Sequence, residues 1–180
     1  MNILDLNLKE LRLALDSGEL TSSELVHFYL DRVAKLNHDG PNLNAILELN
    51  PELEHLANAK DSEHRRGKAK GALHGIPVLL KDNVDTHDML HTSAGSLALK
   101  DHYAPKDSYV VKRLRKAGAI IFGKANMTEW ANFMTQNMRN GYSSRGGQVF
   151  NPYGPNVFDV SGSSSGSAAA VAARMVPVAV

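Results

Sequence analysis

The chain has 180 residues, 43% of them hydrophobic, and a formal net charge of +1 at pH 7. That length and composition predict one globular domain with a sizeable core, and the near-neutral charge provides no electrostatic footprint for nucleic acid. The absence of cysteine excludes a disulfide framework, a thiolate metal site and a cysteine nucleophile. No stretch has the length needed to span a bilayer and the start lacks the pattern of a secretory signal, so we expect a cytoplasmic protein with no membrane partner.

Three helices are predicted in the first part of the chain. Asn7 caps the first helix, and Thr21 with Glu24 forms a capping box at the start of the second. A third, polar helix is predicted to begin at Pro51, because proline suits the first helical position, and its charged side chains are interpreted as a solvated face. We therefore treat residues 1–70 as an N-terminal helical region.

A strand, a helix and a second strand follow. Residues 75–80 form an apolar run that predicts a buried strand, and Lys81 comes directly after it. A helix is predicted from residue 107 to Gly118, with a second buried strand over residues 119–122. This order implies a parallel βαβ unit. Because sites in open α/β sheets form beyond the carboxyl ends of strands, Lys81 is expected at a functional edge.

Three segments follow the second strand, and the last of them, a turn, is predicted to reach the same edge as Lys81. Residues 126–133 are predicted as a short helix and residues 137–153 as a long polar loop. A turn rich in glycine and serine, residues 162–167, then runs into an alanine-rich helix. Backbone amides at the positive end of a helix dipole suit an anion or a developing oxyanion, so this turn is a candidate site.

Two other patterns imitate known sites. The glycines at 118 and 123, with Lys124, have the spacing of a phosphate-binding loop, but Ala125 stands where a magnesium-binding hydroxyl is needed, and a strand explains the apolar residues between them. His87 and His91 have the spacing of a zinc-protease helix, but no third ligand is evident. We interpret them as exposed loop histidines and expect no metal.

Lys81 and the clustered serines suggest a specific chemistry. Burial disfavours the ammonium form of a lysine and lowers its pKa, and the neutral amine can then take a proton from a hydroxyl. A serine becomes an effective nucleophile only when such a base activates it. The alternative for Lys81 taken alone is a side chain at a strand end that reaches solvent.

Three segments, residues 75–83, 123–130 and 162–170, together resemble the amidase signature family in order and spacing. The resemblance implies an α/β/α sandwich around a mixed β-sheet, no cofactor, and a catalytic triad of serine, cis-serine and lysine. Lys81 matches the lysine, and Ser163 matches the bridging serine, with a cis peptide bond after Gly162. The resemblance also implies that four residues bind substrate: Asn126, Met127, Gly162 and Ser164.

The resemblance runs from about residue 73 to the end, and one departure accompanies it. The family's nucleophilic serine follows the bridging serine in a glycine-rich turn, which this sequence does not reach before Val180. We therefore expect residues 71–180 to be the N-terminal part of the family's core, in a truncated single domain that is inactive by itself. Residues 175–180 resemble the strand that leads into the missing turn.

The implied function is an amidohydrolase that cleaves a carboxylic amide, either a small molecule or a peptide. The segments around Trp130 and Arg145 are most similar to the bacterial peptide-amidase branch. Two alternatives stay open at this point: an amidotransferase component that acts on aminoacyl-tRNA, and a non-catalytic module that binds an anion. The sequence does not indicate the oligomeric state.

Overall fold

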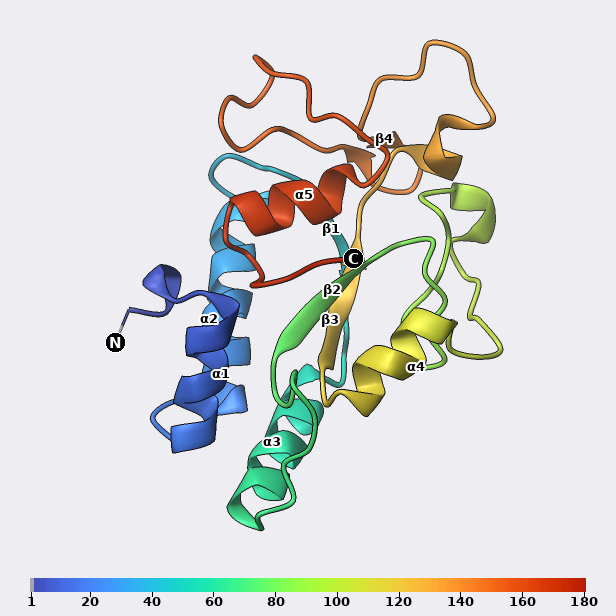
Figure 1. Cartoon of the computed structure of the whole chain (residues 1–180). Coiled ribbons are helices and arrows are strands. Elements are labelled where there is room, and N and C mark those ends of the chain that lie inside the picture. Colours follow the sequence, from blue (N-terminus) through green and yellow to red (C-terminus); the bar gives the residue numbers. More distant parts are fainter. Residues whose placement is uncertain (1) are drawn as a thin grey trace.

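A computed structural model of the chain describes residues 2–180. A small mixed β-sheet lies at the centre, with helices packed around it (Figure 1). Its strands are β1 (Ile46–Leu49), β2 (Pro77–Lys81) and β3 (Ile120–Ala125), in the spatial order β1-β3-β2. β2 and β3 run parallel, as the βαβ pattern predicts, and β1 runs antiparallel to β3.

The end of the chain extends the sheet beyond β2. Leu79 and Ala179 form a parallel bridge, so residues 178–180 lie alongside β2. The backbone N–H of Lys81 donates to the carbonyl of Val180 at 2.9 Å. Within residues 175–180, which resemble a strand in the sequence, the structure forms an isolated bridge at Ala179.

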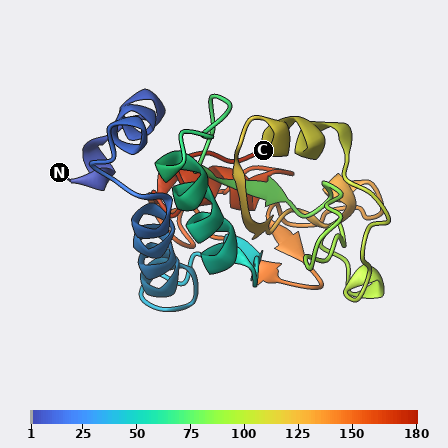
Figure 2. The ribbon, with the colours of Figure 1, turned by 90° about the horizontal axis from the view of Figure 1, so that it is seen from below.

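The helices surround the sheet on two sides. They are α1 (Leu8–Ser17), α2 (Ser22–Val33), α3 (Leu53–Arg65), α4 (Tyr109–Lys116) and α5 (Ser165–Ala172), with a π-helical turn over Ala34–His38. Seen from below, α1 and α2 lie on one side of the molecule, away from α4 (Figure 2). None of the helices that the structure describes between residues 2 and 180 is long and apolar enough to cross a membrane.

The capping residues act as the sequence predicts for two helices and not for the third. Capping boxes are present at Asn7, before α1, and at Thr21, before α2. The third helix begins at Leu53 rather than at Pro51, so that prediction is wrong. The reason is Asn50, whose side chain accepts from the N–H of residue 52 at 2.9 Å and donates to a β3 carbonyl at 3.0 Å, which makes residues 51 and 52 a turn.

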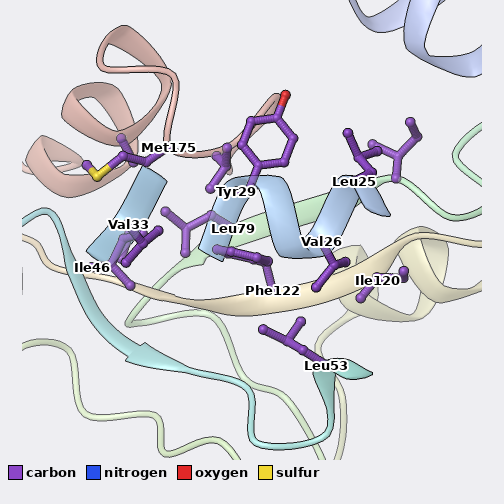
Figure 3. Close-up of a cluster of buried hydrophobic side chains, with 14 of the residues drawn as sticks. Leu25, Val26, Tyr29, Val33, Ile46, Leu53, Leu79, Ile120, Phe122 and Met175 are labelled. Carbon is purple, nitrogen blue, oxygen red and sulfur yellow. The ribbon is translucent and has the colours of Figure 1, made fainter. Parts of the chain in front are cut away.

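Apolar side chains form two cores, one on each face of the sheet. Successive residues of a strand point to opposite faces, so Leu79 and Phe122 face α2, α3 and α5, whereas Leu80 and Ile121 face α4. Figure 3 shows the larger core, where side chains of α2 meet those of β1, β2 and β3. This sandwich of helices around a mixed sheet confirms the α/β fold class.

Two further predictions are corrected by the structure. Residues 1–70 are not purely helical, because β1 lies within them and pairs with β3, so the sheet joins the two predicted regions. The helix predicted over residues 126–133 is reduced to a 3-10 turn, Glu129–Asn132, in which Trp130 and Ala131 have positive φ angles of 48° and 55°. The long polar loop contains a hairpin of β4 (Tyr142–Ser143) and β5 (Gly147–Gln148).

Candidate active site

Lys81 and Ser163 meet at the carboxyl end of β2. Lys81 is the last residue of β2, and Ser163 lies in the turn just before α5. The Lys81 Nζ atom donates a hydrogen bond to the Ser163 Oγ atom at 2.7 Å, and partial burial lowers the pKa of the lysine below its ordinary value. The Gly162–Ser163 peptide bond is cis, which confirms the expectation drawn from the resemblance.

The turn that carries Ser163 is held from the β3 side by Thr128. The backbone N–H of Thr128 donates to the carbonyl of Ser163 at 3.1 Å, and its hydroxyl accepts from the N–H of Gly141 at 2.8 Å. A Cβ atom at Gly162 would lie 2.6 Å from the Thr128 hydroxyl, closer than real contacts allow. Glycine is therefore needed at residue 162 because Thr128 approaches so closely. Gly162 and Ser164 are both exposed beside the Lys81–Ser163 pair.

Small residues let α5 sit directly on the end of the sheet. Gly166 is buried, and its N–H donates to the carbonyl of Asn126 at 2.9 Å. A Cβ atom there would lie 2.3 Å from the carbonyl oxygens of both Asn126 and Ala45. Ala169 and Ala170 are also buried, in the core beneath the helix. The small side chains of α5 thus allow its close approach to the sheet.

Asn126, a predicted substrate-binding residue, is buried and uses its whole side chain inside the protein. Its Oδ1 atom accepts from the N–H of Met127 at 2.8 Å and from the hydroxyl of Ser143 at 2.7 Å. Its Nδ2 atom donates to the carbonyls of Asn44 at 3.2 Å and Gly147 at 3.3 Å. An amide engaged in this way joins the segment before β1 to the β4–β5 hairpin and has no group left to offer a ligand.

Met127, the other predicted binding residue on this segment, borders a cavity of about 330 Å³. The cavity lies between the loop after β2 and the turn after β3, and its lining combines apolar with polar side chains: Asn83, Asp85, Thr92, Ala94, Leu99, His102, Met127, Trp130 and Ala131. Of the four predicted binding residues, therefore, Gly162 and Ser164 are exposed next to Lys81, Met127 borders a separate cavity, and Asn126 is enclosed.

Lys124 is a buried charge that the sequence reasoning missed. It is fully buried in β3 and donates to the carbonyl of Val84 at 2.7 Å and to the hydroxyl of Thr92 at 2.8 Å. Burial lowers its pKa to about 8, although nearby carboxylates, first that of Asp82, oppose the shift. The length of the second strand would have revealed it, because β3 continues to Ala125 rather than ending at residue 122 and so includes Lys124.

The two patterns that imitate other sites have structural explanations. Gly118 ends α4 with a φ angle of 88°, and Gly123 lies inside β3, so the glycine spacing follows from a helix end and a strand. His87 is exposed, as predicted, but His91 is only partly exposed and its Nδ1 atom lies 2.9 Å from a Glu48 carboxylate oxygen. Within residues 2–180, no three His, Cys, Asp or Glu side chains gather closely enough to hold a metal ion.

Comparison with known proteins shows to which family the chain belongs. The sequence matches the protein-family model described as Amidase over residues 24–180. The chain belongs to the amidase family. It is 45% identical to a putative amidase of Schizosaccharomyces pombe, over 97% of this chain and 29% of that protein. It is 42% identical to a glutamyl-tRNA(Gln) amidotransferase component of an Azoarcus species, over 98% of this chain and 34% of that protein.

Among solved structures, the native peptide amidase of Stenotrophomonas maltophilia superimposes on this amidase-family chain with a TM-score of 0.93. The two are 47% identical over 97% of this chain and 35% of the peptide amidase. The fold is therefore that of the amidase family. The chain spans about a third of the length of the relatives it matches.

Proposed function

We propose that this chain forms the amino-terminal part of an amidohydrolase that cleaves a carboxylic amide through a serine activated by Ser163 and Lys81. The observation that carries the proposal is the 2.7 Å hydrogen bond from Lys81 Nζ to Ser163 Oγ at the carboxyl end of β2. A lysine whose pKa is lowered by burial can act as the base in such a pair, whereas an ordinary surface lysine is protonated at neutral pH.

In the proposed reaction, a serine beyond residue 180 attacks the amide carbonyl. Its proton passes to the Ser163 oxygen as the Ser163 proton passes to neutral Lys81, so the amine becomes an ammonium while the acyl–oxygen bond forms. The same relay returns a proton to the departing ammonia or amine as the carbon–nitrogen bond breaks. Water then attacks the acyl–serine ester. The relay takes a proton from the water and returns it to the serine oxygen as the acyl–oxygen bond breaks and the acid leaves.

The position of the chain's last residues supports this location for the nucleophile. The carbonyl of Val180 accepts from the N–H of Lys81 at 2.9 Å and from the hydroxyl of Ser167 at 3.0 Å. Any residue that follows Val180 therefore lies close to Lys81, the proposed base, and to the first turn of α5. Amides preorganised in such a turn stabilise an oxyanion, and losing one donor typically lowers kcat about 10² to 10³-fold.

We further propose a peptide amide or another small carboxamide as the substrate. The similarity to a peptide amidase supports this class, and the exposed residues Gly162 and Ser164 leave the Lys81–Ser163 pair open to a ligand. An amidotransferase component is the second candidate, because the identity to the Azoarcus protein is 42%, close to the 45% shared with a putative amidase. A purely anion-binding module would need no hydrogen bond between Lys81 and Ser163.

The test is an assay of the full-length gene product against C-terminal peptide amides and simple carboxamides, with release of ammonia as the readout. Hydrolysis that is lost in Ser163→Ala, with the circular dichroism spectrum unchanged, is the expected result. Ammonia transfer to glutamyl-tRNA(Gln) in the presence of partner proteins, without free hydrolysis, would favour the amidotransferase. Binding of sulfate with no turnover of any amide would favour the anion-binding module.

A further inference from the structure

A chain of buried charges begins at the residue directly after Lys81. Asp82 is the first residue of the turn after β2, and its N–H donates to the carbonyl of Ala125 at 3.1 Å. Its carboxylate is fully buried and accepts from the N–H of Gly95 at 2.8 Å and from the hydroxyl of Ser93.

Arg145, in the loop between β4 and β5, bridges that carboxylate to a second one. Its Nη1 atom donates to Asp82 Oδ1 at 3.2 Å, and its Nη2 atom donates to Glu48 Oε2 at 2.6 Å. Its own backbone N–H donates to the carbonyl of Gly95 at 2.9 Å. The Arg145 side chain is only 14% exposed, and those of Asp82 and Glu48 are 0% and 19% exposed. The guanidinium therefore connects the end of β2 to the edge strand β1.

The hairpin that carries Arg145 is tied in turn to the elements that hold Ser163. The hydroxyl of Ser143, two residues before Arg145, donates to Asn126 Oδ1 at 2.7 Å, and the carbonyl of Asn126 accepts from the N–H of Gly166 in α5 at 2.9 Å. Gly141, at the start of the hairpin, donates to the Thr128 hydroxyl, and Thr128 holds the carbonyl of Ser163. One side of the hairpin thus contacts the strand of Lys81, and the other contacts the supports of Ser163.

We propose that Arg145 is a positioning residue, which fixes the end of β2 against the β4–β5 hairpin and thereby sets the approach of Lys81 to Ser163. The inference rests on the proposed function and deepens it. A planar guanidinium offers separate nitrogens in a fixed plane to Asp82 and Glu48, whereas a lysine offers one flexible point charge. Only arginine can therefore hold both carboxylates and the strand end in one geometry.

The experiment compares Arg145→Met, Arg145→Lys and the double variant Arg145→Met with Glu48→Gln in the full-length gene product. The readouts are kcat and KM for a peptide amide, corrected for the folded fraction, and the melting temperature. Arg139→Met is the matched control, because Arg139 is exposed in the segment just before β4 and makes no ion pair within residues 2–180. It should leave both kinetics and melting temperature unchanged.

We expect Arg145→Met to lower the melting temperature, because it leaves the buried Asp82 carboxylate without its ion-pair partner and leaves Glu48 with His91 alone. We also expect kcat to fall about ten- to a hundredfold with KM nearly unchanged, since a misplacement of catalytic groups by about 1 Å can cost that much. Arg145→Lys and the double variant should recover much of the melting temperature, because each restores the charge balance in part. Neither should recover kcat.

Two outcomes would overturn the inference and leave Arg145 with a purely structural role. One is a wild-type kcat in Arg145→Lys, and the other is a wild-type kcat in Arg145→Met after correction for the folded fraction. Should Arg145→Met not fold, Arg145→Lys alone decides between these outcomes. If the wild-type protein itself turns over no amide, the proposed function fails separately. A crystal structure of Arg145→Lys then decides the inference, because an unchanged hydrogen bond from Lys81 to Ser163 would overturn it.

Discussion

Two lysines lie at the ends of neighbouring strands and point to opposite faces of the sheet: Lys81 is the last residue of β2, and Lys124 is the last but one of β3. Lys81 pairs in register with Ala125, and Lys124 pairs with Leu80, so the two side chains leave the sheet on different sides. Lys81 reaches Ser163, whereas Lys124 is enclosed by Val84 and Thr92. Burial lowers the pKa of both amines, but only Lys81 lies beside an exposed turn.

At this scale, we predict that Lys81→Ala and Lys81→Arg both abolish amide hydrolysis in the full-length gene product. An arginine keeps the positive charge but cannot accept a proton at working pH, so it should not rescue the reaction. Turnover of a small amide is the measurement, with circular dichroism as the control for folding. Near-normal activity in Lys81→Arg would remove Lys81 from the mechanism.

The same residue gives a prediction about pH. The proposed base is the neutral amine, so kcat/KM should rise as the pH passes upward through the pKa of Lys81. Burial lowers that pKa below the ordinary 10.5, and the rise should therefore come at a lower pH than for a free lysine. A pH–rate profile that rises only where an exposed lysine titrates would contradict the assignment.

Lys124 gives a prediction about stability rather than rate. Its pKa is about 8 in the folded protein, against an ordinary value of 10.5, so between these values the unfolded chain binds more protons than the folded one. The free energy of unfolding should therefore contain a term that is complete above pH 10.5 and is lost as the pH falls through about 8. Urea unfolding at a series of pH values from about 8 toward 10.5 should show this rise, which Lys124→Met should remove.

At the scale of elements, the start of α5 is the tightest junction around the site. Gly166 lies against the carbonyls of Ala45 and Asn126, and the turn before it carries Ser163. This junction joins the helix to both β1 and β3. A change in the distance between α5 and the sheet should move the Ser163 hydroxyl relative to Lys81, because close-packed interiors transmit such shifts.

We predict that Gly166→Ala destabilises the protein by at least about 1–3 kcal/mol, the usual cost of overpacking, because backbone carbonyls cannot move aside as flexible side chains do. The loss of hydrolysis should exceed the loss of folded protein, since the helix would be lifted together with Ser163. Ala168→Ser, at an exposed position of the same helix, is the control. Equal stability of Gly166→Ala and wild type would show that α5 does not sit as closely as the structure indicates.

At the scale of the whole molecule, several large apolar side chains lie on the surface. Phe133 is 90% exposed and Tyr153 is 79% exposed, and both belong to the loops between β3 and α5. Contiguous exposed apolar surface favours association.

We predict that residues 1–180 expressed alone have no amidase activity above background and tend to aggregate or dimerise. The Lys81–Ser163 pair supplies a base and a bridging hydroxyl, but no covalent route exists without the proposed nucleophile and its oxyanion donors. Amide hydrolysis should be measured against the full-length product at equal concentration, with light scattering for the oligomeric state. Activity in a monodisperse fragment that disappears in Ser163→Ala would instead make a serine of residues 161–167 the attacking group.

The sequence by itself determined the features that depend on local patterns. The cap at Asn7, the capping box at Thr21, the parallel pair of strands and the turn into α5 follow from propensities and periodicities confined to short windows. The family resemblance added the pairing of Lys81 with Ser163. Lys81 and Ser163 are too far apart in the sequence for one local pattern to contain both. Residue patterns alone therefore did not exclude that the Lys81 side chain reaches solvent.

Tertiary structure decided the rest, because it depends on contacts between residues far apart in the chain. β1 has too few residues to show a clear period and is a strand because β3 pairs with it. The predicted helix after β3 is lost because Thr128 and Asn126 are drawn into contacts with the hairpin and α5. The burial of Lys124 and the bridge from Arg145 to Asp82 and Glu48 likewise form only when the loops close over the sheet edge, since a charge is buried where distant partners satisfy it.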